Sequence, residues 1–548
     1  MDTKALRQKI LDLAIRGKLV PQDSNDEPAS VLLERIRQQK QQMVKEGKLK
    51  PKDIKNDSVI FVGEDNLHYE KFSDGSVKCI EDEIPFELPD GWAWARLGTV
   101  VTFVGGYAYK SNRYVQHSNN LLIRIGNVKN NSLTPHVAKT CISDEYAAET
   151  SGYRLRVNDI LFTMTGTRGK RDYFFSCLIK KEDLSGANLF LNQRVGCLRL
   201  IDTKLMIPDY FVEAIQSSCV LDAIFATETG NVNQGNIGST ATLNLLIPVP
   251  PTSEQYKIFE RTYSLISSID QYDIESAELL CLIHAIKSKI LDLAIRGQLV
   301  PQAPADEPAS VLLERIRAEK EELIRQGKIK RDKKESVIFR GEDNSYYEKI
   351  GSDVICIDAE IPFEIPDTWK WMRLENCCIK EIRRGKSPKY VDESGTLVFA
   401  QKCNTKYGGI DMGLALFLDE STLGRYPDDE YMQNGDVVIN STGTGTLGRV
   451  GLFRVTDNHL GLPIVPDSHV TVIRAAHGIQ SVYVYGFMKA NQSKLEKKGE
   501  GSTNQKELKP PTLKEMLIPI PPYFEQERIV AAITAAFSTI SAIEKSLN

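Results

Sequence analysis

The chain has 548 residues, of which 41% are hydrophobic and 26% charged, as in a water-soluble globular protein. This length exceeds one ordinary domain of roughly 100–200 residues, and no run of about 18 apolar residues predicts a membrane span. The formal net charge of −4 is low for a nucleic-acid binder. The N-terminus alternates charged and apolar residues, unlike a signal peptide, and the ten cysteines include no C-x-x-C pair. We therefore expect reduced thiols and a cytoplasmic location.

The charge is unevenly distributed. Between Trp92 and Pro250 there are 16 Lys and Arg against 12 Asp and Glu, and between Trp369 and Pro521 there are 20 against 17. Two mildly basic blocks are thus joined by acidic segments. Neutral domains reach such values by chance, so this pattern favours nucleic-acid binding only weakly.

A long duplication organises the chain. ILDLAIRGKLVPQ (Ile10–Gln22) returns as ILDLAIRGQLVPQ (Ile290–Gln302), and DEPASVLLERIR follows both copies. EIPFELPDGWAWARL from Glu83 matches EIPFEIPDTWKWMRL from Glu360, and LLIPVPPTSEQ from Leu245 matches MLIPIPPYFEQ from Met516. Between these motifs the similarity fades for about 150 residues. We infer a tandem duplication with similar frames and divergent centres.

In chain order, the first predicted helices are short and charged. ERIRQQKQQMVKEGKLK (Glu34–Lys50) and its copy ERIRAEKEELIRQGKIK (Glu314–Lys330) each contain a glycine that ends a helix. Because they occur twice, each could face one copy of a partner. The alternative is a solvated helix that covers the helical hub.

A heptad pattern predicts a long central helix over 252–296, which contains neither Gly nor Pro. Its apolar seam is Ile258, Thr262, Leu265, Ile269, Tyr272, Ser276, Leu279, Ile283, Ile286, Ile290 and Leu293. Gly297 is expected to end this helix.

The two chain ends carry the same pattern. The N-terminal seam is Leu6, Ile10 and Leu13, and the C-terminal seam is Ile529, Ile533, Ala536, Ile540, Ile543 and Leu547. By their place in the duplication, they correspond to the second and first halves of the central helix. We expect them to be two halves of one helix that pairs antiparallel with the intact one about an approximate two-fold axis. The alternative is that unrelated amphipathic helices pack on their nearest domains.

Motifs that would carry catalysis are weak. Gly443, Gly445 and Gly448 form a G-x-G-x-x-G, but strand-like sequence follows as well as precedes it, which favours a tight loop between strands over a cofactor site. Ile520-Pro-Pro-Tyr523 resembles the loop of adenine methyltransferases, yet Ile520 cannot accept a hydrogen bond from the base. There is no P-loop, no H-E-x-x-H and no convincing cluster of nuclease carboxylates. We therefore expect a non-catalytic chain.

The duplicated motifs, in this order, resemble the specificity subunit of type I restriction-modification enzymes. NDILFTMTGTRGK (Asn158–Lys170) and NGDVVINSTGTGTLGR (Asn434–Arg449) form a further matching pair inside the divergent centres. The resemblance spans essentially the whole chain. It implies two target-recognition domains, each reading half of a split double-stranded DNA sequence, separated by helical spacers. It also implies two modification subunits that bind S-adenosylmethionine and methylate adenine. Restriction subunits would complete the complex, and ATP and Mg are likewise expected in partner subunits rather than in this chain.

The expected fold is mixed α/β, with two β-rich target-recognition domains. They are linked by two long antiparallel coiled-coil helices, one intact and central, the other split between the termini. The expected boundaries are 1–85 for an N-terminal helical region, 86–250 for the first recognition domain, 251–360 for the central region with the long helix, 361–521 for the second recognition domain and 522–548 for the C-terminal helix. No membrane partner is expected.

Candidate DNA contacts are polar clusters flanked by strand-like runs, because Asn and Gln can read adenine, Arg can read guanine, and Lys and Thr mostly contact phosphate. In the first block they are Tyr107, Tyr109, Lys110, Arg124, Asn127, Thr165, Thr167, Arg168, Lys170, Arg171, Gln193, Arg194, Asn231, Asn233 and Gln234. In the second block they are Arg383, Arg384, Lys386, Lys389, Lys402, Asn404, Lys406, Thr442, Thr444, Thr446, Arg449, Ser502, Thr503, Asn504, Gln505 and Lys506. For any one residue, an ordinary solvated loop is the alternative.

Other residues are assigned to packing. The tryptophans Trp92, Trp94, Trp369 and Trp371 recur at matched positions and are expected to be packing anchors. Strand-core positions are Phe103, Val104, Leu121, Leu122, Ile160, Leu161, Val437 and Val438. The main hypothesis is a DNA-specificity subunit whose two half-sites differ, because the two blocks carry different side chains. The alternatives are a duplicated protein-binding adaptor and a self-sufficient methyltransferase or nuclease.

Overall fold

The protein is described by a computed structural model that covers residues 2–231, 233–329, 331, 335–406, 409–443, 445–500 and 506–547. The chain divides into two compact units, Met1–Glu275 and Ser276–Asn548. Each combines helices with several small β-sheets, so the expected mixed α/β class with two similar domains is confirmed.

Among the described residues, unit 1 contains seven α-helices and the first part of an eighth. They are α1 (Thr3–Ile15), α2 (Ala29–Lys45), α3 (Leu97–Val100), α4 (Asp144–Glu149), α5 (Pro208–Ile215), α6 (Ser218–Ala226), α7 (Ser239–Leu243) and α8 (Thr252–Ile295). Its strands are β1 (Ser58–Val62), β2 (His68–Phe72), β3 (Val77–Cys79), β4 (Ala93–Arg96), β5 (Val101–Gly105), β6 (Tyr114–Val115), β7 (Asn120–Ile123), β8 (Val128–Lys129), β9 (Ser132–Leu133), β10 (Cys141–Ile142), β11 (Ile160–Thr163), β12 (Thr165–Gly166), β13 (Ser176–Leu178), β14 (Asn188–Leu191), β15 (Val195–Leu200), β16 (Thr229–Asn231), β17 (Gln234–Asn236) and β18 (Leu246–Val249).

Unit 2 contains the rest of α8 with α9 (Ala309–Arg325), α10 (Ser481–Ala490), α11 (Gln492–Lys497), α12 (Pro510–Lys514) and α13 (Tyr523–Leu547). Its strands are β19 (Ser336–Arg340), β20 (Tyr346–Ile350), β21 (Asp353–Cys356), β22 (Lys370–Arg373), β23 (Arg383–Arg384), β24 (Tyr390–Val391), β25 (Leu397–Phe399), β26 (Leu416–Leu418), β27 (Val437–Asn440), β28 (Val450–Leu452), β29 (Ile464–Pro466), β30 (Val470–Ile473) and β31 (Leu517–Ile520).

The two divergent centres share one strand topology. A four-stranded antiparallel sheet runs β13-β11-β15-β5 in unit 1 and β28-β27-β30-β23 in unit 2. A second sheet runs β14-β7-β10-β6 in unit 1 and β29-β25-β26-β24 in unit 2. The first pair in each order, β14 with β7 and β29 with β25, is parallel. We call these two sheets, with the loops that join them, the recognition core of each unit. The centres thus keep their fold although their sequences have diverged.

The repeated motifs meet in one hydrogen-bonded network that explains why they recur together. Trp92 Nε1 and Gln22 Nε2 donate to the two oxygens of the Glu254 carboxylate, at 2.9 and 3.1 Å. In unit 2, Trp369 and Gln302 donate to Glu525 in the same way. Burial raises the pKa of Glu254, and these two hydrogen bonds oppose that rise.

The glycine that ends each repeated helix is required by its conformation and its neighbours. Gly17 has φ +63° and Gly297 has φ +68°, a region that favours glycine. A Cβ at Gly17 would lie 2.4 Å from Pro89, and one at Gly297 would lie 2.5 Å from Pro366. The helix end and the Pro-Asp motif before the tryptophans therefore pack directly together.

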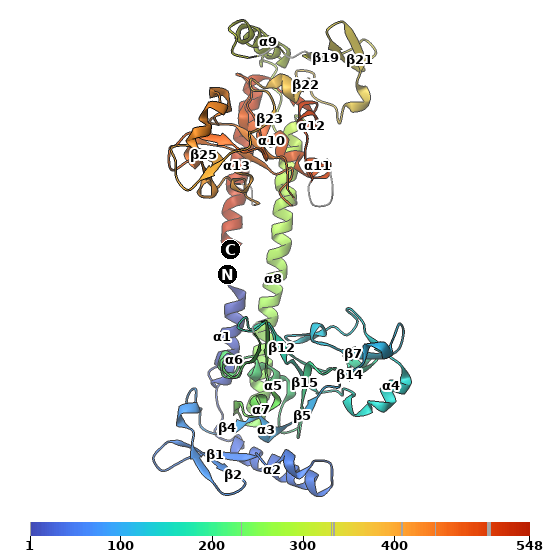
Figure 1. Ribbon diagram of the computed structural model, residues 1–548, viewed down its shortest axis with the longest axis vertical. Coiled ribbons are helices and arrows are strands. Elements are labelled where there is room, and N and C mark those ends of the chain that lie inside the picture. The colour runs from blue at the N-terminus through green and yellow to red at the C-terminus, as the bar shows by residue number, and fades with distance from the viewer. Residues whose placement is uncertain are drawn as a thin grey trace. The chain divides into compact units, whose positions relative to one another are not determined.

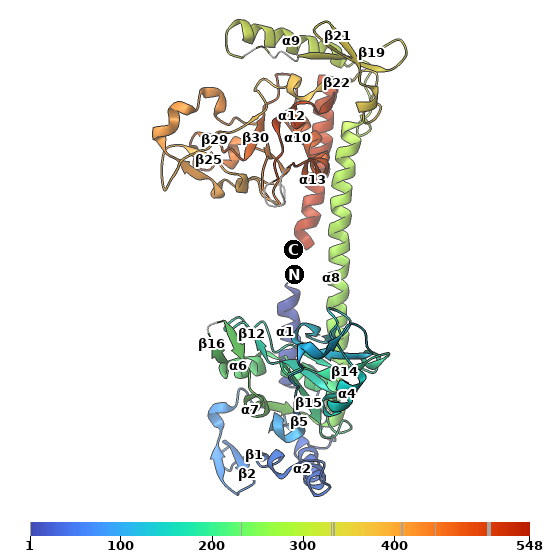
Figure 2. The same ribbon diagram turned by 45° about the vertical axis from the view of Figure 1, so that its right-hand side comes forward.

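The long helix is confirmed as α8, and in each unit a terminal helix lies beside it (Figures 1 and 2). In unit 1, Arg7 of α1 contacts Asp270 at 2.5 Å and Asp273 at 2.8 Å. In unit 2, Lys287 of α8 contacts Glu544 of α13 at 2.7 Å.

The predicted seam is buried only in part. Its buried members among the described residues are Ile10, Ile258, Thr262, Ile269, Ile283, Ile529, Ile533 and Ile540. Leu6, Leu279, Ile286 and Ile543 are exposed, in contrast to the prediction. The periodicity alone does not distinguish positions covered by a recognition core from positions that only a neighbouring helix can shield.

The helix α13 also corrects an expectation about membranes. Among the described residues, Tyr523–Ser546 is long and apolar enough to cross a bilayer by length and composition, with a mean hydropathy of 1.3. A helix packed in a protein core meets the same criterion. Ile529 and Ile533 belong to the hydrophobic core of unit 2, but only 17% of the apolar window is buried, so core packing accounts for only part of the composition of α13.

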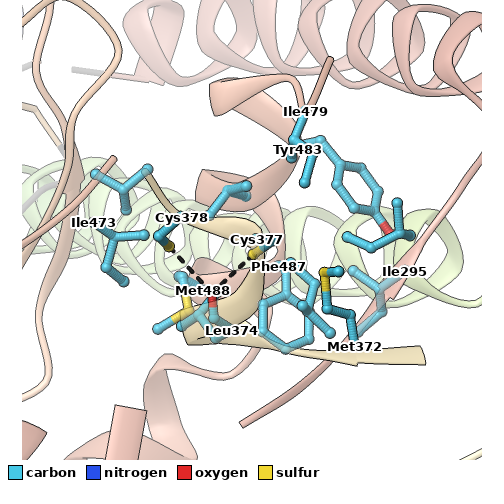
Figure 3. Packing of buried hydrophobic residues seen from close by; sticks show 14 of the residues in the cluster. Ile295, Met372, Leu374, Cys377, Cys378, Ile473, Ile479, Tyr483, Phe487 and Met488 are labelled. Atoms are coloured by element: carbon cyan, nitrogen blue, oxygen red, sulfur yellow. Dashed lines mark hydrogen bonds between the residues drawn. The ribbon is translucent and has the colours of Figure 1, made fainter. Parts of the chain in front are cut away.

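The core of unit 2 accounts for the adjacent cysteines (Figure 3). Cys377 and Cys378 are buried, and both thiols donate to the Leu374 carbonyl, at 3.0 and 3.1 Å. Tyr483 and Phe487 of α10 pack in the same cluster. All ten cysteines are free, as expected. The four tryptophans are also buried and serve as packing anchors.

Candidate nucleic-acid interface

Many of the predicted DNA contacts of unit 1 lie where several strands begin or end, on one side of the recognition core. Because Thr163 pairs with Val195 and Gly196 pairs with Gly105, the ends of β11 and β5 lie beside the start of β15. Asn192 N donates to Ile123 O at 3.2 Å, which brings the ends of β7 and β14 to the same place. The segments just beyond these strands form what we call the strand-end surface of unit 1.

Backbone hydrogen bonds join the predicted residues of this surface. Gln193 N donates to Tyr107 O at 3.0 Å, and Met164 N, just before Thr165, donates to Arg194 O at 3.1 Å. Arg124 directly follows β7. Arg124, Gln193 and Arg194 are exposed, whereas Tyr107 and Thr165 are half-buried. Five residues predicted from separate motifs therefore share one surface.

A small sheet, β12-β17-β16, adds the loop after Thr165 to this surface. Thr165 pairs with Asn236, and Arg168 Nη1 donates to Gly230 O at 2.9 Å. The Glu228 carboxylate fixes the loop by accepting hydrogen bonds from Gly169 N at 3.1 Å and Tyr173 Oη at 2.7 Å. Burial raises the pKa of Tyr173, and the hydrogen bond to Glu228 raises it further. The structure thus joins the predicted Thr165–Arg171 and Asn231–Gln234 segments.

The predicted side chains of these two segments differ in their exposure and in their existing partners. Arg168, Lys170, Asn231, Asn233 and Gln234 are exposed. Thr167 is half-buried, and its backbone N–H donates to Asp172 at 2.7 Å. Arg171 is paired with Asp222 at 2.6 Å and lies over the Phe225 ring, so its charge is already partnered.

Two predicted contacts of unit 1 lie inside the protein. Asn127 is buried and its amide donates to Thr134 O and Val137 O, each at 2.9 Å. Tyr109 is buried in an aromatic cluster with Tyr107, and burial raises the pKa of Tyr109 to about 12. Direct contact of either with DNA is corrected to support of the loop, because these side chains are not accessible. The neighbouring Lys110 is exposed.

Unit 2 forms an equivalent strand-end surface. Gly385 N donates to Val470 O at 2.9 Å, and Asp467 N donates to Phe399 O at 3.1 Å. The Thr442 hydroxyl lies 2.6 Å from His469 Nδ1, and Thr442 also bridges to Glu507. These contacts place Lys386, Thr442, His469 and the exposed Lys506, next to Glu507, at one edge.

The predicted basic cluster of unit 2 is largely neutralised by acidic partners. Arg383 contacts Glu430 at 2.7 Å, and Lys389 contacts Asp419 at 2.6 Å. Arg384 forms an ion pair with Glu507. Lys386 donates to the Arg425 carbonyl. All four predicted DNA contacts of this cluster therefore already have a partner within unit 2, far away in the sequence, and their contact with DNA stays a prediction.

The loop after β27 is held from within. Asn404 is buried and its amide donates to Asn440 Oδ1 at 3.2 Å, so its predicted DNA contact is corrected to a structural one. Arg449 Nη1 donates to Asn404 O at 2.7 Å. Thr446 is half-buried and its hydroxyl donates to Thr442 O at 3.1 Å. The loop joins β27 to β28, which confirms the strand–loop–strand expectation for the glycine motif.

Some of the remaining predicted DNA contacts of unit 2 are exposed, and others lie outside the described residues. Lys402 and Lys406 are exposed and have no side-chain partner among the described residues. Thr444, Ser502, Thr503, Asn504 and Gln505 lie outside the described residues.

Several residues at these surfaces are not among the predicted contacts. Asn192, Asp467 and His469 occupy the turns that precede β15 and β30. A signal was present, since NQRV and DSHV each lead into a strand, with Arg199 and Arg474 four residues after the valine. Those arginines contact Asp159 at 2.7 Å and Asp436 at 2.7 Å, which are equivalent ion pairs.

The chemistry of both surfaces is that of recognition. They offer Arg, Lys, Asn, Gln, Thr and His side chains on a fixed backbone, groups that hydrogen-bond base edges and phosphates. Among the residues that the structure describes, no three His, Cys, Asp or Glu side chains are grouped to hold a metal ion.

Comparisons with known proteins fit this picture. The family described as the type I restriction modification DNA specificity domain matches residues 89–278 and 366–548. The chain is similar to the type I restriction enzyme EcoAI specificity subunit of Escherichia coli, with 28% identity over 68% of this chain and 62% of that protein. It is also similar to the EcoEI specificity subunit of Escherichia coli, with 25% identity over 99% of this chain and 90% of that protein. A solved chain from work on complex assembly and conformational transition of the type I R-M system has a TM-score of 0.51 at 16% identity, covering 84% of this chain and 94% of that one. This structural likeness concerns the fold alone.

Proposed function

This chain belongs to the type I restriction modification DNA specificity domain family, and on that premise we propose that it is the DNA-specificity subunit of a type I restriction-modification complex. The observation that carries the proposal is the pair of strand-end surfaces. Two recognition cores have one strand order but different side chains at the same edge. One backbone with two sets of donors and acceptors suits the reading of two different half-sites.

Recognition would use base edges and phosphates together. In unit 1, exposed Arg168, Arg194, Asn231 and Gln234 supply the fork and amide groups that match guanine and adenine in the major groove. Lys170 in unit 1 and Lys402 in unit 2 suit phosphate contacts, which position the protein without selecting a sequence.

The chain would act without catalysing a reaction itself. Methyl transfer would belong to two modification subunits with S-adenosylmethionine, and cleavage to restriction subunits with ATP and Mg. The family assignment and the names of the similar proteins support these partners. A cytoplasmic location follows from the same proposal.

The helices would set the spacing between half-sites. We infer that α8 forms a coiled coil, and that α1 and α13 serve as the two parts of a second long helix related to it by an approximate two-fold axis. The matched heptad positions of the three segments support this. The five expected segments, with recognition domains over 86–250 and 361–521, remain part of the proposal.

A binding selection tests the function. The full chain, assembled with its modification subunit, is offered duplexes that contain randomised sequence. We expect enrichment of a split, non-palindromic sequence. A complex that prefers no sequence over random DNA would contradict the proposal and favour the adaptor, whereas methyl transfer by the chain alone would identify an enzyme.

A further inference from the structure

Two short turns occupy equivalent places in the recognition cores. Asn192–Arg194 connects β14 to β15, and Asp467–His469 connects β29 to β30. Each turn is closed by the same backbone hydrogen bond, from Val195 N to Asn192 O at 2.9 Å and from Val470 N to Asp467 O at 3.1 Å. We call them the reading turns.

A glycine fixes each reading turn from the neighbouring segment. A Cβ at Gly106 would lie 2.0 Å from Asn192 O, and one at Gly385 would lie 2.1 Å from Pro466 O. The residue after each glycine forms a parallel bridge to the first residue of the turn, Tyr107 to Asn192 and Lys386 to Asp467. Only a glycine permits this approach, so both turns are held in the same position by the backbone.

The side chains on these fixed turns differ completely. Unit 1 presents Gln193 and Arg194, both exposed and without a side-chain hydrogen bond or ion pair to another described residue. Unit 2 presents Ser468 and His469 at the same places. His469 is exposed, and its Nδ1 is engaged by the Thr442 hydroxyl, so its Nε2 is the ring nitrogen left for a ligand.

We propose that the reading turns are specificity-determining elements, and that Arg194 reads a guanine in the half-site of unit 1. This inference rests on the proposed function. A guanidinium presents two parallel donors that match O6 and N7 of guanine, and a fixed backbone keeps that fork in register. His469 and Ser468 at the same position offer fewer donors, so unit 2 selects a different base there.

The experiment exchanges the turns in the full chain assembled with its modification subunit. The double variant Gln193→Ser, Arg194→His is selected on the randomised library beside the unaltered protein. We expect the preferred base to change at one or two positions of a single half-site, while the other half-site is retained. The reciprocal variant Ser468→Gln, His469→Arg should change the other half-site only.

Single variants separate base reading from charge. Arg194→Ala should lose about tenfold or more of the discrimination at a guanine position. Arg194→Lys keeps the charge and should lose that discrimination too, while the salt dependence of binding stays the same. Lys180→Ala is the matched control, because Lys180 is also an exposed cation. It lies near Asp159 at the start of β11, whereas Arg194 lies near the end of that strand.

The outcomes distinguish this inference from the proposed function. If the unaltered complex selects a split sequence and all turn variants select the same one, the reading turns are not specificity elements. If the unaltered complex selects no sequence, the proposed function itself is wrong. Because the exchanged side chains are at the surface, we expect thermal denaturation midpoints to match the unaltered protein, and Arg194→Lys provides the test with the smallest change of structure.

Discussion

Glu213 should make the stability of unit 1 depend on pH, and Glu213→Gln should remove that dependence. Glu213 lies in α5 and is 8% exposed, facing Thr262 of α8, which is fully buried. In unit 2 the equivalent residues are Gly486 and Ile533, which carry no carboxyl group, and a Cβ added at Gly486 would lie 3.7 Å from Ile533 Cδ1. Burial raises the pKa of Glu213 from 4.5 to about 9, and the nearby Thr262 hydroxyl only partly opposes this rise.

The magnitude follows from proton linkage. In the folded protein the carboxyl keeps its proton up to about pH 9, whereas in the unfolded chain it ionises near pH 4.3. Unfolding between these values releases a proton, so the free energy of unfolding falls by about 1.4 kcal/mol for each pH unit gained. From pH 6 to pH 8 the unaltered protein should lose about 3 kcal/mol relative to Glu213→Gln, which has no proton to release.

The assay must read unit 1 separately from unit 2. Both proteins are equilibrated in urea at pH 6, 7 and 8, then pulse-labelled at one fixed pH, and deuterium uptake is read for peptides of α5 and α10. Glu260→Gln, at an exposed position of α8, is the control and should follow the unaltered protein. Parallel loss of stability in Glu213→Gln and the unaltered protein would refute the reasoning, because the carboxyl would then be ionised inside the fold.

Three further predictions concern single side chains. Gly106→Ala should destabilise unit 1 by about 1–3 kcal/mol in urea unfolding, since the new Cβ would meet Asn192 O, while Gly126→Ala, which meets nothing within 4 Å, should not. Lys40→Met should cost about 3–5 kcal/mol, because it leaves Asp57 without the buried ammonium 2.6 Å away, and a smaller loss is expected for Lys320→Met, whose ammonium donates to the Glu375 and Asn376 carbonyls. Arg168→Ala should weaken binding to the preferred DNA by about 1–3 kcal/mol if the side chain reads a base, and should lower the salt slope by about one if it touches phosphate. A binding isotherm unchanged at every salt concentration would place Arg168 outside the interface.

The sequence predicted the frame of the molecule well. Close repetition located the motifs of Trp92 and Gln22, and the heptad pattern over 252–296 matches α8 to within one residue. Trp92 and Gln22 both donate hydrogen bonds to Glu254. These bonds could not be predicted from the sequence, because the three residues are far apart in the chain.

The surfaces could be predicted only in part. Polar motifs between strands predicted Gln193 and Arg194 as DNA contacts. Both side chains are exposed, as such a contact requires. The pairing of Arg383 with Glu430 was invisible, because a cation's partner is set by tertiary folding and not by neighbouring residues. The equivalence of His469 with Arg194 was hidden for a similar reason, since strand order persists where side chains change.

The pairing of β4 with β18, and of β22 with β31, has a consequence for how such a protein can change. Arg96 pairs with Leu246, and Arg373 pairs with Leu517, so the chain enters and leaves each recognition core at neighbouring positions. Everything between those strands is a cassette with adjacent ends. A foreign segment with the same two ends would fit the unchanged frame whatever its internal length. New DNA specificities can therefore arise by recombination of whole segments.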